Sequence, residues 1–167
     1  MFASFAESFK RDGSRLREIA GRTNQMPCPT FEKTDETISE IDFVLIAHEL
    51  GFEKALETSV DCSADRDFCV EFAGAAALVG LHLSNLANEV LAKLDAGDAS
   101  KRQALEIARG KAVKTFGHQT ILLSILKGLP VKPTAGDLNE ICEIVFDAAD
   151  NLKFCLPAMT LILKELP

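Results

Sequence analysis

Apolar residues recur every three or four positions along most of this chain, which is the spacing of one face of an α-helix. The pattern is clearest over residues 68–94, where one unbroken apolar stripe consists of Phe68, Phe72, Ala75, Val79, Leu83, Leu86, Val90 and Leu94. Gly97 follows this stripe as a stop signal. No stretch alternates apolar and polar residues as a half-buried strand does. The pattern therefore predicts an all-α protein.

Two helices are predicted before this stripe. The first starts at the beginning of the chain and ends before Pro27, which interrupts the pattern. Its apolar positions are Phe2, Phe5, Phe9, Leu16 and Ile19. The second fits residues 35–50, where Thr37 and Glu40 have the spacing of a capping box. Gly51 then supplies its end.

Two long helices are predicted after the stripe. Asp98 is placed to cap the first, which ends at Gly128 and Pro130. Its apolar positions are Leu105, Ala108, Ala112, Phe116, Leu122 and Leu126. The second opens at Asp137, and its apolar positions are Leu138, Ile141, Val145, Leu152, Met159 and Ile162. Pro157 falls inside it, and we expect a kink there because proline removes one backbone donor.

Length and charge describe an ordinary globular chain. Its 167 residues are enough to bury a core, so we expect a single helical-bundle domain over residues 1–167. The net charge is −7, and the densest basic group, Arg11 to Arg22, contains Asp12 and Glu18. We interpret that group as a solvated helix face. We therefore expect neither nucleic acid nor an anionic membrane as a partner.

Two further features bear on location. No segment has the ~18 uninterrupted apolar residues that cross a bilayer. The first residues also lack the charged and then apolar layout of a signal peptide. A cytoplasmic protein is the resulting expectation.

The cysteines and histidines give no sign of a metal site. The five cysteines are odd in number and lack C-x-x-C spacing, so we expect buried free thiols rather than disulfides. Cys62, near a helix start, is an alternative reactive thiol, although the acids around it oppose that role. His48, His82 and His118 lie in separate segments without metal-ligand spacing. Neither a metal nor a cofactor is expected.

The helices are long for a chain of this size. A helix of about 30 residues is about 45 Å long, and three such rods leave long flanks uncovered. The helix over residues 68–94 also has a small-residue face made of Ala73, Gly74, Ala77 and Gly80. That face fits either a tight contact within the chain or a contact with another chain. We expect a homo-oligomer, a dimer or a tetramer, whose helices share one bundle.

Two motifs connect these helices with a known family. Residues 59–68 read "SVDCSADRDF" and residues 108–118 read "ARGKAVKTFGH". Together with "DLNEICEIVFDAAD" at residues 137–150, they resemble, in order, segments of the argininosuccinate lyases of the fumarase/aspartase superfamily. The resemblance covers nearly the whole chain. It implies the long-helix central domain of that family, which assembles as a tetramer around a shared bundle.

The chain departs from the resemblance where the family carries its chemistry. The family's flexible loop, G-S-S-x-M-P-x-K-x-N-P, carries a catalytic serine, but residues 92–104 read only "AKLDAGDASKRQA". The amino-terminal H-x-R-S-R-N and T-H-x-Q segments have no counterpart. Pro133 and Thr134 replace Tyr-Asn, Asn139 replaces Gln, Cys142 replaces Lys, and the chain contains no tyrosine. We therefore do not expect argininosuccinate cleavage.

Some polar residues of the family pattern remain, and two interpretations fit them. The candidates for a site are Ser59, Asp61, Arg66 and His118. In the functional interpretation, Arg66 anchors a substrate carboxylate beside Ser59 and Asp61, and His118 acts as a base. In the structural interpretation, which we favour, Ser63 or Asp65 caps the helix and Arg66 pairs with neighbouring acids.

Three functions are consistent with this pattern. We favour a non-catalytic oligomeric scaffold, a pseudoenzyme derived from a lyase. The first alternative is a specialised enzyme that acts on a small carboxylated or guanidino-bearing substrate at a remodelled cleft between subunits. The second is a regulatory subunit that joins a full-length lyase homologue. Whether the chain is an enzyme of some other kind is left open by the residues.

Overall fold

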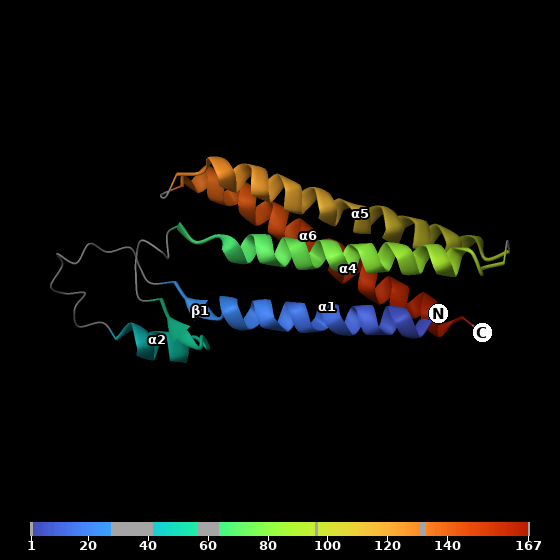
Figure 1. The fold of residues 1–167 in the computed structure, drawn as a ribbon, viewed down its shortest axis with the longest axis horizontal. Coiled ribbons are helices and arrows are strands. Elements are labelled where there is room, and N and C mark those ends of the chain that lie inside the picture. Colours follow the sequence, from blue (N-terminus) through green and yellow to red (C-terminus); the bar gives the residue numbers. More distant parts are fainter. Residues whose placement is uncertain (1, 28–41, 57–63, 96, 131–132, 167) are drawn as a thin grey trace.

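Long helices laid side by side form almost all of the described structure (Figure 1). The computed structural model describes residues 2–27, 42–56, 64–95, 97–130 and 133–166. The elements, in chain order, are α1 (Phe2–Thr23), β1 (Gln25–Met26), α2 (Phe43–Glu49), β2 (Lys54–Ala55), α4 (Asp67–Leu91), α5 (Ala99–Gly128) and α6 (Ala135–Lys164). The predicted all-α class is confirmed.

A two-stranded parallel pair is the one departure from the helical pattern in the described residues. β1 and β2 pair Gln25 with Lys54 and Met26 with Ala55. Each strand is too short to show a period of two, so the sequence did not predict it. The pair ties the end of α1 to the segment after α2.

Helix α4 is the centre of the bundle, with α1, α5 and α6 packed around it. Its predicted stripe is buried from Ala75 to Leu94, but the prediction is wrong at Phe68, which is 42% exposed, and Phe72 is only partly buried. From Val79 onward, the stripe forms one core with the inward residues of α5 and α6, including Leu105, Ala112, Leu152 and Met159. Leu94 also lies in this core although α4 ends at Leu91.

The small-residue face of α4 serves packing inside the chain. A Cβ atom added to Gly80 would lie 2.4 Å from the Thr115 Oγ1 and 2.7 Å from the Ala112 carbonyl oxygen. Gly74 lies against Gln119, 3.1 Å from its Nε2 by the same construction. The glycines therefore let α5 approach α4 closely, which is the first of the two uses that the sequence allowed.

Several predicted helix boundaries need correction. Helix α2 begins at Phe43 behind Asp42, whose side chain accepts hydrogen bonds from the N–H groups of Val44 and Leu45 at 3.0 Å each. Thr37 and Glu40 lie outside the described residues. Gly51 does end the helix, with a φ of 85° that other residues rarely adopt.

The two long carboxyl-terminal helices also start differently from the prediction. Asp98 occupies the cap position of α5, but its side chain makes no capping hydrogen bond. Thr134, three residues before Asp137, caps α6, and Asp137 is the third helical residue of a capping box. Helix α6 then continues through Pro157 to Lys164.

One predicted core position on α5 is wrong. Phe116 is exposed, and Thr115 and His118 are the buried residues at that level. Thr115 can be buried because its hydroxyl donates to the Ala112 carbonyl at 2.6 Å. A polar side chain that hydrogen-bonds to the backbone of its own helix can be buried, and a pattern of hydrophobic positions does not predict this.

Helix α4 alone among the described helices is long and apolar enough to cross a membrane by length and composition. Half of its most apolar window is buried inside the fold, however, and the core helix of a globular bundle has the same composition. The helix is weak evidence for a membrane span, and its apolar residues are explained by packing.

The described ends of the chain lie together. Figure 1 shows the N and C labels at the same end of the bundle. Phe2 and Leu166 line one apolar pocket of about 400 Å³ with Phe5, Phe9 and Leu163. A neighbouring pocket of about 290 Å³ shares Phe9, Leu86 and Leu163, so a groove runs beside α1 over α4 and α6.

Candidate functional site

The pocket that contains Arg66 lies where α1 ends and α4 begins. It measures about 340 Å³, and its lining comes from three separate parts of the chain. The residues are Arg22, Thr23, Gln25, Pro27, Leu56, Asp65, Arg66 and Phe68. The pocket therefore brings a second arginine, Arg22, to the predicted carboxylate anchor Arg66.

Both arginine side chains have hydrogen-bond partners within the chain. The Arg22 Nε donates to both carboxylate oxygens of Glu71, at 3.1 and 3.0 Å. The Arg66 Nη1 donates to the carbonyl oxygen of Asp65. The Gln25 side chain is also fixed in place, because its Nε2 donates to the Arg22 carbonyl oxygen at 2.7 Å. Of these contacts, the Arg22–Glu71 pair joins α1 to α4, whereas the other two are local.

The start of α4 agrees in part with the structural interpretation. The Asp65 Oδ1 accepts a hydrogen bond from the N–H of Asp67, the first helical residue, at 2.8 Å. Arg66 occupies the cap position and its side chain makes no capping hydrogen bond. Asp65 thus satisfies one of the free N–H groups at the helix start, as predicted. Ser63, Ser59 and Asp61 lie outside the described residues, as does Cys62.

His118 lies on α5, away from the lining of this pocket. Its Nε2 is 2.8 Å from the Asp147 Oδ2, and the Asn151 Nδ2 donates to the same oxygen at 3.2 Å. The ring is only 9% exposed, and its Nδ1 is buried without a hydrogen-bond partner among the described residues. His118 therefore links α5 to α6. The structure does not join it with Arg66 in one site.

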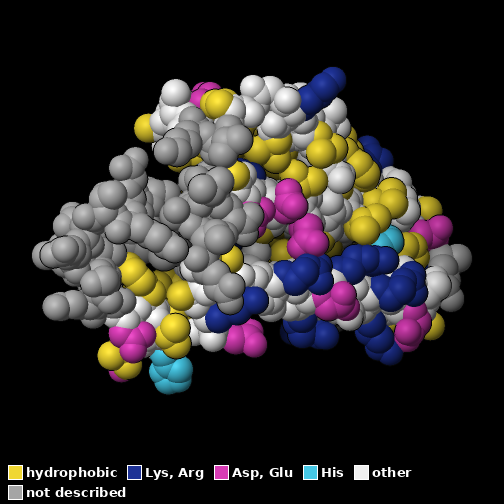
Figure 2. Space-filling view, turned by 60° about the vertical axis from the view of Figure 1, so that its left-hand side comes forward, with side chains coloured by type: hydrophobic (Ala, Val, Ile, Leu, Met, Phe, Trp, Pro, Cys, Tyr) yellow, Lys and Arg dark blue, Asp and Glu magenta, His cyan; other side chains and the backbone are white. Residues whose placement is uncertain are grey.

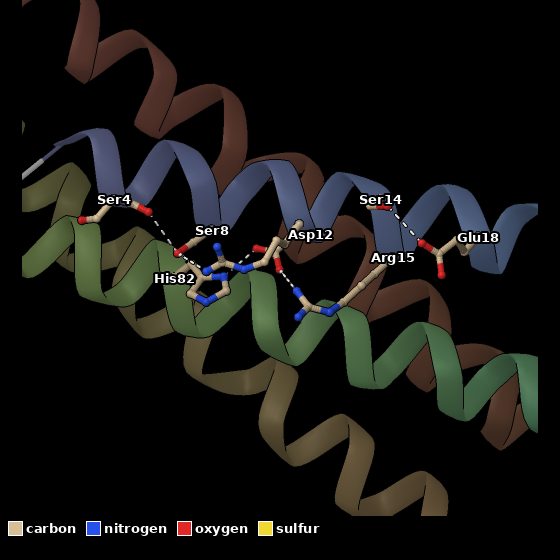
Figure 3. A network of polar contacts seen from close by, with 8 residues as sticks. Ser4, Ser8, Asp12, Ser14, Arg15, Glu18 and His82 are labelled. Carbon is tan, nitrogen blue, oxygen red and sulfur yellow. Dashed lines mark hydrogen bonds and ion pairs between the residues drawn. The ribbon is translucent and has the colours of Figure 1, made fainter.

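The most enclosed charged cluster was not predicted. Asp12 of α1 is 3% exposed, and its two oxygens contact different partners (Figure 3). Oδ1 accepts from the Arg15 Nη1 at 2.8 Å, and Oδ2 lies 2.6 Å from the Nδ1 of His82 on α4. The rings of Phe9 and His82 pack in a T-shaped arrangement at a centroid distance of 6.1 Å.

A signal for this cluster was present in the sequence. Asp12 sits between Phe9 and Leu16 at helical spacing, so it falls within the apolar stripe of α1 and not on a solvated face. The interpretation of the basic group as wholly solvated was therefore wrong at Asp12. A buried carboxylate needs such partners, and here they join α1 to α4.

The cysteines also differ from the expectation that all of them are buried. Cys69 and Cys155 are buried, but Cys142 is exposed on α6. The Cys155 thiol donates to the Ala108 carbonyl at 3.5 Å. No group of three His, Cys, Asp or Glu residues in the described parts of the chain is arranged to hold a metal ion.

The outward sides of α5 and α6 carry many exposed apolar side chains. On α5 and α6 they are Ile107, Val113, Phe116, Ile121, Leu123, Phe146, Phe154 and Leu161. Figure 2 shows hydrophobic side chains gathered over one broad region of the surface, above a row of Lys and Arg with Asp and Glu between them.

Two glycines lie among these residues without any close neighbour. A Cβ atom added to Gly110 or to Gly117 would have no heavy atom within 4 Å. They are seven residues apart, and so lie on one line along α5. Glycine inside a helix costs about 1 kcal/mol relative to alanine. Unlike Gly80, neither of these two glycines makes a close contact with another helix in the described parts of the chain.

Comparison with known proteins gives a consistent result over nearly the whole chain. This chain is 35% identical to the argininosuccinate lyase of Prochlorococcus marinus strain MIT 9515, over 98% of this chain and 39% of that protein. It is 37% identical to the argininosuccinate lyase of Synechococcus sp. strain JA-3-3Ab, over 97% of this chain and 36% of that protein. No family model matches the chain.

These relatives are much longer than this chain, so the similarity applies to only part of each of them. This chain spans about two fifths of the curated relatives that it matches. The match to the Prochlorococcus protein also runs over 182 residues, which is more than the 167 of this chain. That relative therefore has residues within the matched region for which this chain has no counterpart.

Proposed function

This chain is argininosuccinate lyase-like over almost its whole length, and we propose that it serves as a non-catalytic, homo-oligomeric helical scaffold. The observation that carries the proposal is the pair of open glycines on α5 within an exposed apolar surface. A helix from a second copy that packs over Gly110 and Gly117 would use both the apolar area and the close approach that glycine permits.

Charge favours a particular pairing of helices. The charged residues of α5 are mainly basic: Lys101, Arg102, Arg109, Lys111, Lys114 and Lys127, against Glu106. Those of α6 are mainly acidic: Asp137, Glu140, Glu143, Asp147 and Asp150, against Lys153 and Lys164. Across a two-fold axis, α5 of one copy therefore packs better on α6 of the other than on a second α5.

The non-catalytic part of the proposal rests on missing chemistry. The chain contains no tyrosine, and the family's serine loop has no counterpart in residues 92–104. The described residues around this interval form a short turn between α4 and α5. The Arg102 side chain holds that turn by donating to the Leu94 and Asp95 carbonyl groups. A compact turn supplies neither a mobile loop nor a base.

The test is molar mass by light scattering, with ligand retention read by mass spectrometry. We expect the wild type to be a dimer or a tetramer that retains no small molecule. Gly117→Leu should lower the molar mass because it places a side chain in the contact, whereas it should leave the helical content unchanged. Gly21→Leu, at another open helix glycine, is the matched control. A monomeric wild type would overturn the proposal.

A specialised enzyme is the second candidate, and the pocket with Arg22 and Arg66 favours it. A small carboxylate bound there would copurify with the chain. Arg66→Ala should then abolish retention, whereas Arg66→Lys should keep part of it. The regulatory alternative gives a different result, since a longer lyase homologue would copurify with the chain in place of a second copy.

A further inference from the structure

A long apolar groove lies along α1 and is lined by α4 and α6 as well. Its two adjoining pockets measure about 290 and about 400 Å³, near the lower end of the range of small-molecule sites. Helix α1 contributes to the lining from Phe2 to Leu16, a stretch of helix about 20 Å long. The other walls are also apolar, with Leu83 and Leu86 from α4 and Leu163 from α6. The groove is therefore long enough for an extended hydrocarbon chain.

Polar side chains contribute little to this groove. Among the described residues, Asp12 and Thr160 are the two polar side chains in its lining. Asp12 is 3% exposed and is already held by Arg15 and His82. The Thr160 hydroxyl donates to the Leu156 carbonyl oxygen at 2.8 Å. The described lining thus offers a ligand almost no free hydrogen-bonding group, so the body of a ligand that fits the groove has to be apolar.

One cation at the edge of the groove, Arg17, has no hydrogen-bond or ion-pair partner among the described residues. Its Nη2 lies 3.4 Å from a Cβ atom built on Gly13, which lines the groove. The other four basic residues of α1 all have partners: Lys10 with Glu7, Arg11 with Ser8, Arg15 with Asp12, and Arg22 with Glu71. At the far end of the groove, the Lys93 Nζ lies over the Phe2 ring, 4.6 Å from its centroid. Arg17 therefore supplies the available positive charge beside the groove.

We propose that the groove binds a free long-chain fatty acid, whose hydrocarbon chain lies along α1 and whose carboxylate pairs with Arg17. A guanidinium group holds a carboxylate with two parallel hydrogen bonds, and it repels an ammonium head on the same chain. Phe2 and Leu156 of the lining are exposed, so the bound acid exchanges with solvent and does not stay on the chain through purification. The exposed apolar residues assigned above to the oligomer contact do not line the groove, so binding is independent of assembly.

The test is isothermal titration calorimetry of the full chain with myristate, kept below the concentration at which it forms micelles. We expect saturable binding of one myristate per chain, counted by native mass spectrometry, with unchanged helical content by circular dichroism. Laurate, which is two CH₂ groups shorter, should bind about 15-fold more weakly, because each buried CH₂ group contributes about fourfold. Tetradecyltrimethylammonium, which has the same chain length and a positive head, should bind at least about tenfold more weakly.

Two substitutions test where the acid binds. Arg17→Gln should weaken myristate binding about 10- to 100-fold, which is the loss expected for a hydrogen bond between charged groups. Its control is Arg11→Gln, because Arg11 is two residues from Gly13 and so lies on the opposite side of α1. Gly13→Leu should abolish binding, because the new side chain fills the groove. Among the described residues, a Cβ atom there meets within 4 Å only the flexible end of Arg17, so helical content should not change. Gly21→Leu, in open space on the same helix, is the control for Gly13→Leu.

Three results would overturn the proposal: no saturable binding of myristate, equal affinity for the cationic detergent, or full affinity in Arg17→Gln. Binding that appears in Gly117→Leu but not in the wild type would also overturn it, since a second copy would then cover the groove in the assembled protein. Equal affinity of the wild type and of a Gly117→Leu variant with lower molar mass would show that the groove acts within a single chain. The outcome for the fatty acid is thus separable from the outcome for the scaffold.

Discussion

Asp12 shows how one side chain can fix the position of a helix. Its carboxylate lies in the apolar side of α1 and is satisfied by Arg15 of the same helix and His82 of α4. A buried acceptor that loses its partners keeps the full penalty of desolvation, whereas the pair itself adds little net stability. The cluster therefore selects one register of α1 on α4.

Removal of the Asp12 carboxylate should leave His82 without its acceptor. We expect Asp12→Ala to lower the free energy of unfolding by about 2 kcal/mol, measured by urea denaturation. Glu18→Ala is the control, because Glu18 is exposed and, among the described residues, accepts a hydrogen bond only from Ser14. Its effect should stay within about 0.5 kcal/mol. Equal effects of the two substitutions would show that the buried cluster does not fix α1.

The cap of α6 gives the second prediction at this scale, and it depends on pH. The Thr134 hydroxyl and the Thr134 N–H hold the pKa of Asp137 below its ordinary value. Ionised Asp137 therefore stabilises the fold above about pH 4, and this contribution is lost as the pH falls through the lowered value. Thr134→Ala should cost about 1 kcal/mol at neutral pH.

Asp137→Asn tests the sign of this dependence. Urea denaturation from about pH 6 to about pH 2 should show a gap between wild type and variant that closes as the pH falls. A gap that is constant over this range would mean that the charge of Asp137 makes no contribution to the cap.

At the scale of elements, the seam between α4 and α5 depends on Gly80. A methyl group there would meet Thr115 and the backbone of Ala112, and backbone cannot move aside as a flexible side chain can. We expect Gly80→Ala to destabilise the fold by about 1–3 kcal/mol. Gly21→Ala, at a helix glycine with open space, should be neutral or slightly stabilising. Thermal unfolding of both variants makes the comparison.

Most of the helices could be predicted from the sequence, and the elements that were missed or misplaced have physical causes. Long periodic stripes predict α4, α5 and α6 well, because each buries one continuous face. The start of α6 was misplaced because Thr134 and Asp137 both carry capping oxygens, and only the backbone decides which of them precedes the first turn. The β1–β2 pair depends on two segments far apart in the chain, which no local pattern reveals.

The candidate site could be predicted only in part, because local patterns do not reveal contacts between distant segments. The sequence offered Ser63 or Asp65 as the cap of α4, and Asp65 does accept a hydrogen bond from Asp67 there, although Arg66 occupies the cap position. The Asp12–His82 contact joins residues 70 positions apart, and a single sequence shows only that Asp12 falls within an apolar stripe. His118 was placed correctly on a helix, but its partner Asp147 is on another one. Contacts between helices determine a site, and they appear only in the fold.

At the scale of the whole molecule, the outward sides of α5 and α6 should make thermal stability depend on protein concentration. An assembly that forms only from folded chains is stabilised by mass action. We expect the Tm of the wild type to rise as the protein concentration rises, and the Tm of Gly117→Leu to stay constant over the same range. A wild-type Tm independent of concentration would contradict the scaffold proposal.

The shared pocket of Phe2 and Leu166 has a topological consequence. Because the two described ends of the chain lie side by side, the covalent order of the helices can be changed while their packing is kept. A short glycine-serine linker across these ends, with new ends opened beside Pro130 between α5 and α6, gives a circular permutant. We expect its circular dichroism and urea midpoint to match those of the wild type, since the entropy of closing a short loop is small.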